Sequence, residues 1–470
     1  MDAILPNDIL LLIGEQLPHR ADRWSLIFVS RHFHELFLPS LYRCIHFHNW
    51  IAARSFFLSI TTRPTLASAV RELDVSGWQP ELTSDTERED LRKWNPMRQA
   101  IQIYSHSVEE QVQWEDDLVK GLGDAWIALI LPMLNQLRRV HLDLSAHTPI
   151  LERVIKRAVF RERHSHTQTM LRYLRDVSLH RRDDIDHPDA RRKSSNNQDS
   201  AGSAVLLSFF HLPSVRTIVA SSVMDPSSVE GLEHTIENPR ARVSPITEID
   251  LRASSGNQGM EALIAPCANL LSFKYQHSDT HVLSQGYQPT AFHRALAGSK
   301  ETLHTLWLDH YGDHYAFTAA GLNQSHDEWF GSLAEFTALR ELRIRLPNLL
   351  DIRYQSEPSM SLVEVLPSSL ETLFIEGCEE RHMTMLGAQL QAVIKSRSRA
   401  RNLRRVDIEG AFRNDPFDEF RESGGLPSGH PSGNFIREKI IQMAESLHIA
   451  CAIAGAEFRL HDRALTQPSG

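Results

Sequence analysis

The sequence has few cysteines and no long apolar run. Its four cysteines, Cys44, Cys267, Cys378 and Cys451, are scattered without a CxxC pair, so neither a disulfide framework nor a zinc finger is expected. No run of about 18 apolar residues occurs, and no membrane span is expected. No basic residue precedes the first apolar run, so no secretory signal is expected. These absences predict a protein of a reducing compartment, the cytoplasm or the nucleus.

The sequence also lacks an excess of basic charge. Its 50 Lys and Arg residues stand against 59 Asp and Glu residues, which gives a formal net charge of −9. Because non-specific nucleic-acid binding depends on a cationic surface that replaces counterions, nucleic acid is not an expected partner.

Sequence motifs that would identify an enzyme are missing. There is no GxSxG, GxxxxGK[ST] or GxGxxG string, and His34-Glu35 lacks the second histidine of HExxH. Cys44, His46 and His48 alternate and would share one face of a strand, but a metal site needs three or four converging ligands. We therefore expect no catalytic residue, no metal and no cofactor, and we do not expect an enzyme.

Residues 5–41 are expected to form three short helices. Pro6 is suited to starting the first helix and Pro18 to ending it. Ser30 can cap the third helix, which Pro39 is expected to close. A unit of about forty residues buries too little apolar surface to be stable alone. It should therefore pack against a partner or against the following domain.

These residues resemble the F-box family. The family pattern is Leu-Pro, an acidic residue, two aliphatics, a second Leu-Pro, and Val-Ser-Arg before an aromatic residue. Here those positions are Leu5-Pro6, Asp8, Ile9-Leu10, Leu17-Pro18, Val29-Ser30-Arg31 and Phe33, and Leu41-Tyr42 matches the usual end. The sequence departs from the pattern at Asp8, where Glu is commoner, and at Arg23-Trp24, which replace an aliphatic.

The resemblance implies a way of associating with other proteins. F-boxes dock on a Skp-family adaptor, which is held on a cullin scaffold that also carries a RING subunit. This is helix-in-groove recognition driven by apolar burial. An alternative is that the same residues form only a local core. The implied adaptor contacts are Leu5, Pro6, Ile9, Leu10, Ile13, Leu17, Leu26, Val29 and Phe33.

The rest of the chain contains ten windows in which aliphatic residues occupy the first, fourth and sixth positions. They are VRELDV from Val70, LRRVHL from Leu137, LRDVSL from Leu174, VRTIVA from Val215, ITEIDL from Ile246, LLSFKY from Leu270, LHTLWL from Leu303, LRELRI from Leu339, LETLFI from Leu370 and LRRVDI from Leu403. Their starts are 67, 37, 41, 31, 24, 33, 36, 31 and 33 residues apart, and the first interval would hold two units.

One strand and one helix at such a spacing resemble a leucine-rich-repeat solenoid. The fold class expected is therefore α/β: an N-terminal three-helix F-box, residues 1–45, followed over residues 46–470 by an irregular leucine-rich-repeat solenoid with a parallel sheet. The repeat is degenerate, because only Cys378 stands where the family places Asn or Cys after the strand. A doubly wound α/β domain is the competing architecture.

Two segments are expected to be irregular, and one to close the solenoid. Residues 181–203 are charged and nearly free of aliphatics, which predicts a disordered insert. Residues 421–434 form a Gly/Pro/Ser loop. Residues 435–460 read as an amphipathic helix, Phe435 to Ala454, and a short strand, Glu457 to Leu460, that would cap the open end.

The fifth position of each window should face outward, opposite the buried aliphatics. Trp307, Arg343 and Phe374 occupy it and are the best candidates for binding a target, because aromatics and Arg dominate binding hot spots. The two resemblances together imply a substrate-recognition subunit of a Skp–cullin–F-box ubiquitin ligase that binds an unidentified protein target. A non-ligase interaction scaffold, and an enzyme without recognisable motifs, stay open as alternatives.

Overall fold

The computed structural model consists of two compact units, and each is described by itself. Unit 1 is Met1–Ser221 with Ser244–Ile246, and unit 2 is Ser222–Val243 with Thr247–Gly470. The structure describes residues 5–17, 19–78, 84–144, 149–160, 170–181, 199–225, 244–256, 258–278, 287–311, 329–352, 357–396, 401–410, 412 and 436–462.

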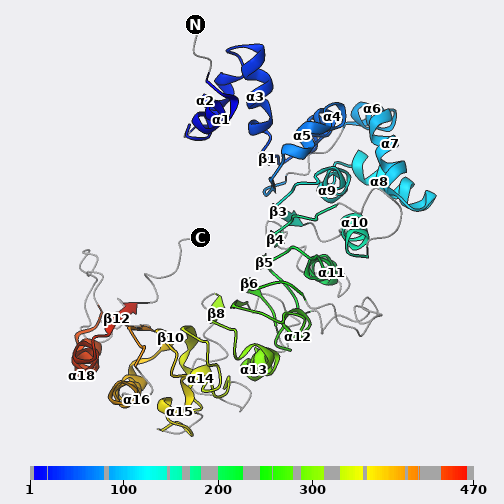
Figure 1. Ribbon diagram of the computed structural model, residues 1–470. Helices are drawn as coiled ribbons and strands as arrows, with labels where there is room; N and C mark the ends of the chain where they lie inside the picture. Colours follow the sequence, from blue (N-terminus) through cyan, green and yellow to red (C-terminus); the bar gives the residue numbers. More distant parts are fainter. Residues whose placement is uncertain are drawn as a thin grey trace, which may run out of the picture. The chain divides into compact units, whose positions relative to one another are not determined.

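Unit 1 begins with three helices, α1 (Asn7–Glu15), α2 (Arg20–Leu26) and α3 (Arg31–Leu41) (Figure 1). Ser30 caps α3 as expected, since its side chain accepts a hydrogen bond of 3.1 Å from the Phe33 amide. The expectation that Pro39 closes this helix is wrong, because α3 continues to Leu41. Burial of Leu41 and Phe37 in the core of the three helices offsets the single backbone bond that a proline in the last turn forgoes.

The five strands described in unit 1 run parallel and pair in sequence order. They are β1 (Cys44–His46), β2 (Glu72–Val75), β3 (Arg139–Leu144), β4 (Asp176–Arg181) and β5 (Thr217–Ser221). Each of β2 to β5 begins two residues after the first aliphatic of its window. The inward residues Leu73, Val140 and Val177 are at most 1% exposed, so the aliphatic positions form the core under the sheet.

Helices lie along one face of these strands (Figure 1). Their bounds are α4 (Trp50–Thr62), α5 (Pro64–Ala69), α6 (Asp85–Arg92), α7 (Asn95–Tyr104), α8 (Val108–Val119), α9 (Gly123–Ile130), the 3₁₀ turn η1 (Leu131–Met133), α10 (Pro149–Phe160) and α11 (Asp199–Phe210). The expectation that two repeats fill the 67-residue interval is wrong: β2 pairs directly with β3. The described part of the interval is largely helical instead, and α8 and α9 bury Trp114 and Trp126 together with aliphatic residues such as Leu118 and Ile127.

Unit 2 repeats the arrangement with seven described strands. They are β6 (Glu248–Ser254), β7 (Ser272–Ser278), β8 (Thr305–Tyr311), β9 (Glu341–Arg345), β10 (Thr372–Cys378), β11 (Arg405–Gly410) and β12 (Glu457–Asp462), again parallel and in sequence order. A doubly wound sheet would reverse its strand order at a switch point. The order within each unit shows no reversal, so that alternative is wrong.

The helical segments described in unit 2 are short until the C-terminal end. They are α12 (Glu261–Ile264), α13 (Pro289–Ala295), η5 (Leu296–Ser299), α14 (Leu346–Leu349), α15 (Leu362–Val365), η7 (Glu380–His382), α16 (Met383–Lys395) and α18 (Glu438–Ala454). The expected closing helix and strand are present as α18 and β12, with α18 starting three residues later than Phe435 and β12 ending two residues beyond Leu460. Gly455 ends α18 at φ 75°, a left-handed conformation that favours glycine.

The expected irregular segments lie largely outside the described residues. Residues 421–434 are wholly outside them, and so are 182–198 of the expected insert 181–203. The two ends of that insert are ordered secondary structure: Arg181 is the last residue of β4, and residues 199–203 belong to α11. Among the described residues no helix is long and apolar enough to cross a membrane.

Candidate functional site

The N-terminal helices expose apolar side chains. Of the seventeen large hydrophobic residues that are exposed in the described part of the chain, seven lie between residues 5 and 29. Such a concentration of exposed apolar surface marks a site of protein or membrane contact. The seven are Leu5, Ile9, Leu12, Ile13, Trp24, Phe28 and Val29.

The nine predicted adaptor contacts divide by environment. Leu5, Pro6, Ile9, Ile13 and Val29 are exposed, with Val29 at 64%. The other four, Leu10, Leu17, Leu26 and Phe33, are half-buried, and of these Leu10, Leu26 and Phe33 pack against the core formed by Ile27, Phe37 and Leu41. The exposed five therefore offer the most surface to a partner, while Leu10, Leu26 and Phe33 hold the helices together.

Three exposed residues of this surface were not among the predicted contacts. Phe28 is 71% exposed, and its ring meets that of Trp24 edge-on at 5.9 Å. Leu12 is 56% exposed beside Ile13 in α1. A signal was available in the sequence, since apolar residues stand on more faces of these helices than a single internal core can cover. We call the seven exposed residues the N-terminal apolar surface.

In unit 2 the fifth window positions form a single row across the sheet. Register pairs Lys274 with Trp307, Trp307 with Arg343, and Arg343 with Phe374. All four side chains are half-buried, whereas the aliphatic residues on either side of each are buried. The structure thus brings the three predicted target-binding residues together, and we call these four residues the stacked row.

Cations and aromatic rings alternate along the stacked row. Lys274 Nζ lies 3.8 Å from the centroid of the Trp307 ring, and Arg343 Cζ lies 5.6 Å from the same centroid. Arg343 Cζ also lies 4.7 Å from the centroid of Phe374, whose other neighbour is the stacked ring of His461 at 5.4 Å. Each contact fits a cation–π or ring-stacking geometry. The row is therefore pre-organised before any partner binds.

Carboxylates fix the orientation of the stacked row. Trp307 Nε1 donates a hydrogen bond of 3.1 Å to Glu341, and Arg343 Nε donates to the buried Glu376. One fifth-position residue departs from the outward expectation: Asp407 is fully buried. It is covered by Arg405 and His461, each 2.6 Å from a carboxylate oxygen. Glu376 and Asp407 thus each lie next to an arginine.

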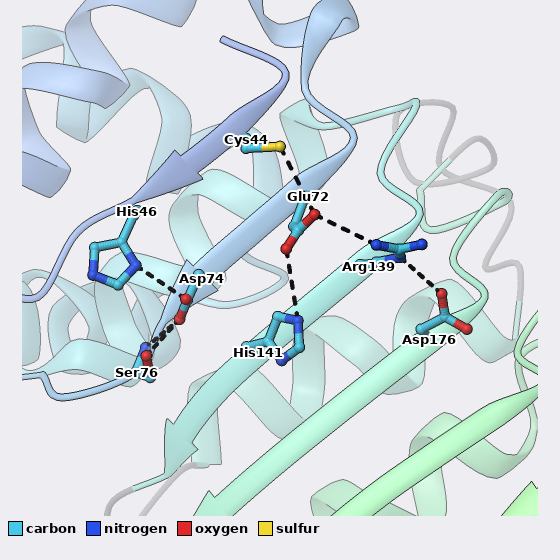
Figure 2. Close-up of polar contacts among 8 residues, drawn as sticks. All are labelled: Cys44, His46, Glu72, Asp74, Ser76, Arg139, His141 and Asp176. Carbon is cyan, nitrogen blue, oxygen red and sulfur yellow. Dashed lines mark hydrogen bonds and ion pairs between the residues drawn. The ribbon is translucent and has the colours of Figure 1, made fainter. Parts of the chain in front are cut away.

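On the corresponding face of unit 1, polar side chains of β1 to β4 contact one another (Figure 2). His46 Nδ1 lies 3.0 Å from Asp74 Oδ2, and Asp74 also accepts hydrogen bonds from Ser76. Burial opposes ionisation of Asp74, but the hydrogen bonds from Ser76 and His46 outweigh it and lower the pKa of this carboxyl. The face thus holds ionised acids next to histidines.

Glu72 is the centre of the second group in Figure 2. Its carboxylate lies 3.8 Å from Cys44 Sγ, from Arg139 Nη1 and from His141 Nε2. Partial burial and the charge of Glu72 raise the pKa of the Cys44 thiol. Cys44 is therefore a weaker nucleophile than an ordinary surface cysteine.

The alternating Cys44, His46 and His48 do not converge. Cys44 and His46 are directed to different carboxylates of β2, and His48 contacts His46 at a ring separation of 5.6 Å. No group of three or more His, Cys, Asp or Glu side chains in the described part of the chain is arranged to hold a metal ion.

Comparisons with known proteins give one match. A family model described as a leucine-rich repeat domain matches residues 40–412, which is more than three quarters of the chain. No curated protein matches. The matched residues run from the end of α3 through β11 and include the faces of both units described above.

Proposed function

The chain belongs to the leucine-rich repeat domain family, and from this premise we propose that it is the substrate-recognition subunit of a Skp–cullin–F-box ubiquitin ligase. The repeats suggest a role in protein interaction. The N-terminal helices bind the Skp-family adaptor, and through it the cullin and RING subunits. The protein then acts in the cytoplasm, the nucleus or both, where its four unpaired cysteines stay reduced.

The N-terminal apolar surface carries this proposal. Three short helices hold it on a small core that centres on Ile27, Phe37 and Leu41, and the last of these helices, α3, precedes the first strand, β1. A surface of this kind is costly to leave in water, at about 25 cal/mol per Å² of apolar area. A partner groove that covers it recovers this free energy, which is the basis of helix-in-groove association.

The target binds the repeats in the same proposal, and the stacked row is its central contact. Aromatic and Arg side chains that are already ordered lose little conformational entropy on binding. Trp307, Arg343 and Phe374 meet this requirement, because neighbouring carboxylates and rings hold each of them in place. The receptor does no chemistry: it raises the local concentration of target lysines near the conjugating enzyme.

Binding of the full-length chain to purified Skp adaptor tests the proposal. The variant Ile9→Asp with Ile13→Asp places two carboxylates on the exposed side of α1, where they disturb no internal core. We expect it to lose more than about 100-fold in affinity, because a charge without a partner is costly to bury in an interface. The wild-type chain should bind at nanomolar to micromolar concentration.

A matched control keeps the result specific. Ile449→Asp with Ile453→Asp makes the same change on the exposed side of α18, where the two isoleucines are 53% and 83% exposed, and it should bind the adaptor like wild type. Failure of the wild-type chain to bind would overturn the proposal. The proposal also requires a target protein whose half-life lengthens when the gene for this chain is removed. If the chain binds the adaptor but no such target exists, it is an interaction scaffold that works outside any ligase.

A further inference from the structure

Five arginines stand one above another along the edge of unit 1 where its strands begin. Each immediately precedes the first residue of a strand, β1 to β5. Their main chains are joined in series, since the amide of each arginine donates to the carbonyl of the one before it at 2.7–2.8 Å. Neighbouring strands lie about 4.8 Å apart, so the guanidinium groups share one narrow edge. We call Arg43, Arg71, Arg138, Arg175 and Arg216 the arginine column.

No acidic residue stands between two members of the arginine column, although Glu15 of α1 pairs with its first member, Arg43, at 3.0 Å. Arg138 and Arg175 are exposed and have no acidic partner among the described residues. Arg71 donates to the Ser68 and Val70 carbonyls at 2.6 and 3.1 Å, which orients its guanidinium without neutralising it. Burial, and then the like charges of its two neighbours in the column, lower the pKa of Arg71.

The fold does not require arginine at this position. A backbone series of the same kind occurs within unit 2, where Thr247, Leu271 and His304 occupy the position in successive repeats. Where arginines do recur there, a glutamate separates them: Glu371 lies 3.9 Å from both Arg340 and Arg404. Unit 2 alternates its charges, as cross-strand pairs normally do, whereas unit 1 aligns like charges that repel one another.

Because neither the backbone nor internal ion pairing explains why Arg71, Arg138 and Arg175 follow one another, we propose that the arginine column binds an acidic segment, rich in Asp and Glu, of a partner protein. Arginine pairs with carboxylates through two parallel hydrogen bonds. Five arginines at the strand spacing cover about 19 Å, the length of about six residues of extended peptide. A nucleic acid is the less favoured polyanion, because the remainder of a chain with net charge −9 repels it.

This inference rests on the proposed function in one respect, that the repeats bind a target protein, and it names the chemical class of that target. It does not depend on the N-terminal apolar surface. A charge change in the column at β3 leaves α1–α3 untouched, so adaptor capture and acidic-segment binding can fail separately.

Substitution Arg138→Glu tests the proposal on the full chain. It places a glutamate between two arginines and so reproduces the arrangement of Arg340, Glu371 and Arg404, which the fold already accommodates. The variant should therefore keep the wild-type circular dichroism and thermal midpoint. Binding is measured by fluorescence anisotropy of a labelled oligoglutamate peptide about six residues long, at low salt and at about 0.5 M salt.

We expect wild type to bind the peptide at low salt, high salt to weaken binding, and Arg138→Glu to weaken it by at least about tenfold at low salt. Arg404→Glu is the control, since it lowers the net charge by the same amount at the equivalent position of unit 2, and it should bind like wild type. No binding by wild type, or an equal loss in the control, would overturn the proposal. Tighter binding of an oligothymidylate of the same length would overturn it in favour of nucleic acid.

Discussion

Asp124 provides a direct test of how burial shapes the stability of unit 1. It lies in the first turn of α9 and is 5% exposed, and its Oδ1 has no hydrogen-bond partner within the described structure. Burial, and then the charge of Asp117, raise the pKa of this carboxyl from 3.8 to about 7. Hydrogen bonds from the Asp124 and Ala125 amides at the helix start oppose the shift but do not cancel it.

The sign of the pH dependence follows from this raised pKa. The folded state binds a proton that the unfolded state releases above about pH 4, so the stabilising effect of protonation is complete at low pH and is lost as pH rises to about 7. The change of this pKa from 3.8 to about 7 corresponds to about 4 kcal/mol. Roughly two thirds of it, about 3 kcal/mol, falls between pH 5 and pH 7.

We therefore predict that Asp124→Asn gains stability relative to wild type as pH rises. Asn cannot ionise, so the free energy of unfolding of the variant minus that of wild type should increase by about 3 kcal/mol from pH 5 to pH 8. Guanidinium unfolding followed by tryptophan fluorescence measures this difference. Six of the eight tryptophans lie in unit 1, and Trp114 donates a hydrogen bond of 3.0 Å to the Ala125 carbonyl, next to the site.

The test is the change of this stability difference with pH, not its value at pH 5. The value at pH 5 also includes the cost of placing the amide NH₂ of Asn in the buried site. Asp116→Asn, at a 47% exposed position of α8, removes the same charge outside the core. A difference that stays constant between pH 5 and pH 8 for Asp124→Asn would refute the reasoning. So would an equal rise in the Asp116 control, since net charge rather than burial would then be the cause.

Two further predictions concern other buried groups. In the wild type the carboxylate of Glu110 lies 2.6 Å from the buried Arg157, and Glu110→Gln removes this partner. The free energy of unfolding should fall by about 3–5 kcal/mol, measured as a lower midpoint of guanidinium unfolding. An unchanged midpoint would contradict this prediction. Of the four cysteines only Cys44 is exposed, so mass spectrometry after maleimide treatment of the native chain should find one labelled thiol, and four after unfolding; labelling of Cys378 in the native chain would show that its repeat is not closed.

The repeat architecture was predictable because its signal is carried by aliphatic residues at fixed positions. All ten windows contain a strand, and in each the strand begins two residues after the first aliphatic. The stacked row was predictable for the same reason: parallel pairing without slippage places Trp307, Arg343 and Phe374 side by side once their windows are aligned.

The helical segment between β2 and β3 was not predictable from the windows. An interval of 67 residues equals two repeat lengths, and length alone cannot distinguish two strands from four helices. The choice between strands and helices depends on packing between residues of different helices, which the window pattern does not show. One example is the hydrogen bond of 3.2 Å that Trp126 Nε1 donates to the Leu118 carbonyl. The pKa of Asp124 is hidden for the same reason, since it depends on burial rather than on neighbouring sequence.

The arginine column shows a different limit of sequence interpretation. Arginine stands second in four consecutive windows, from Val70 to Val215, so the signal was present in the printed sequence. This repetition of arginine can be interpreted only when the strands are known to be parallel and in register. The same window position of every repeat then lies in one row across the sheet. A partner of such a protein meets lines of equivalent residues rather than single side chains. The aliphatic positions must be alike in every repeat because they fill the core. Specificity for a partner therefore resides in the remaining positions. In unit 1 these are the arginines at the strand starts, and in unit 2 they are the alternating cations and aromatic rings of the stacked row.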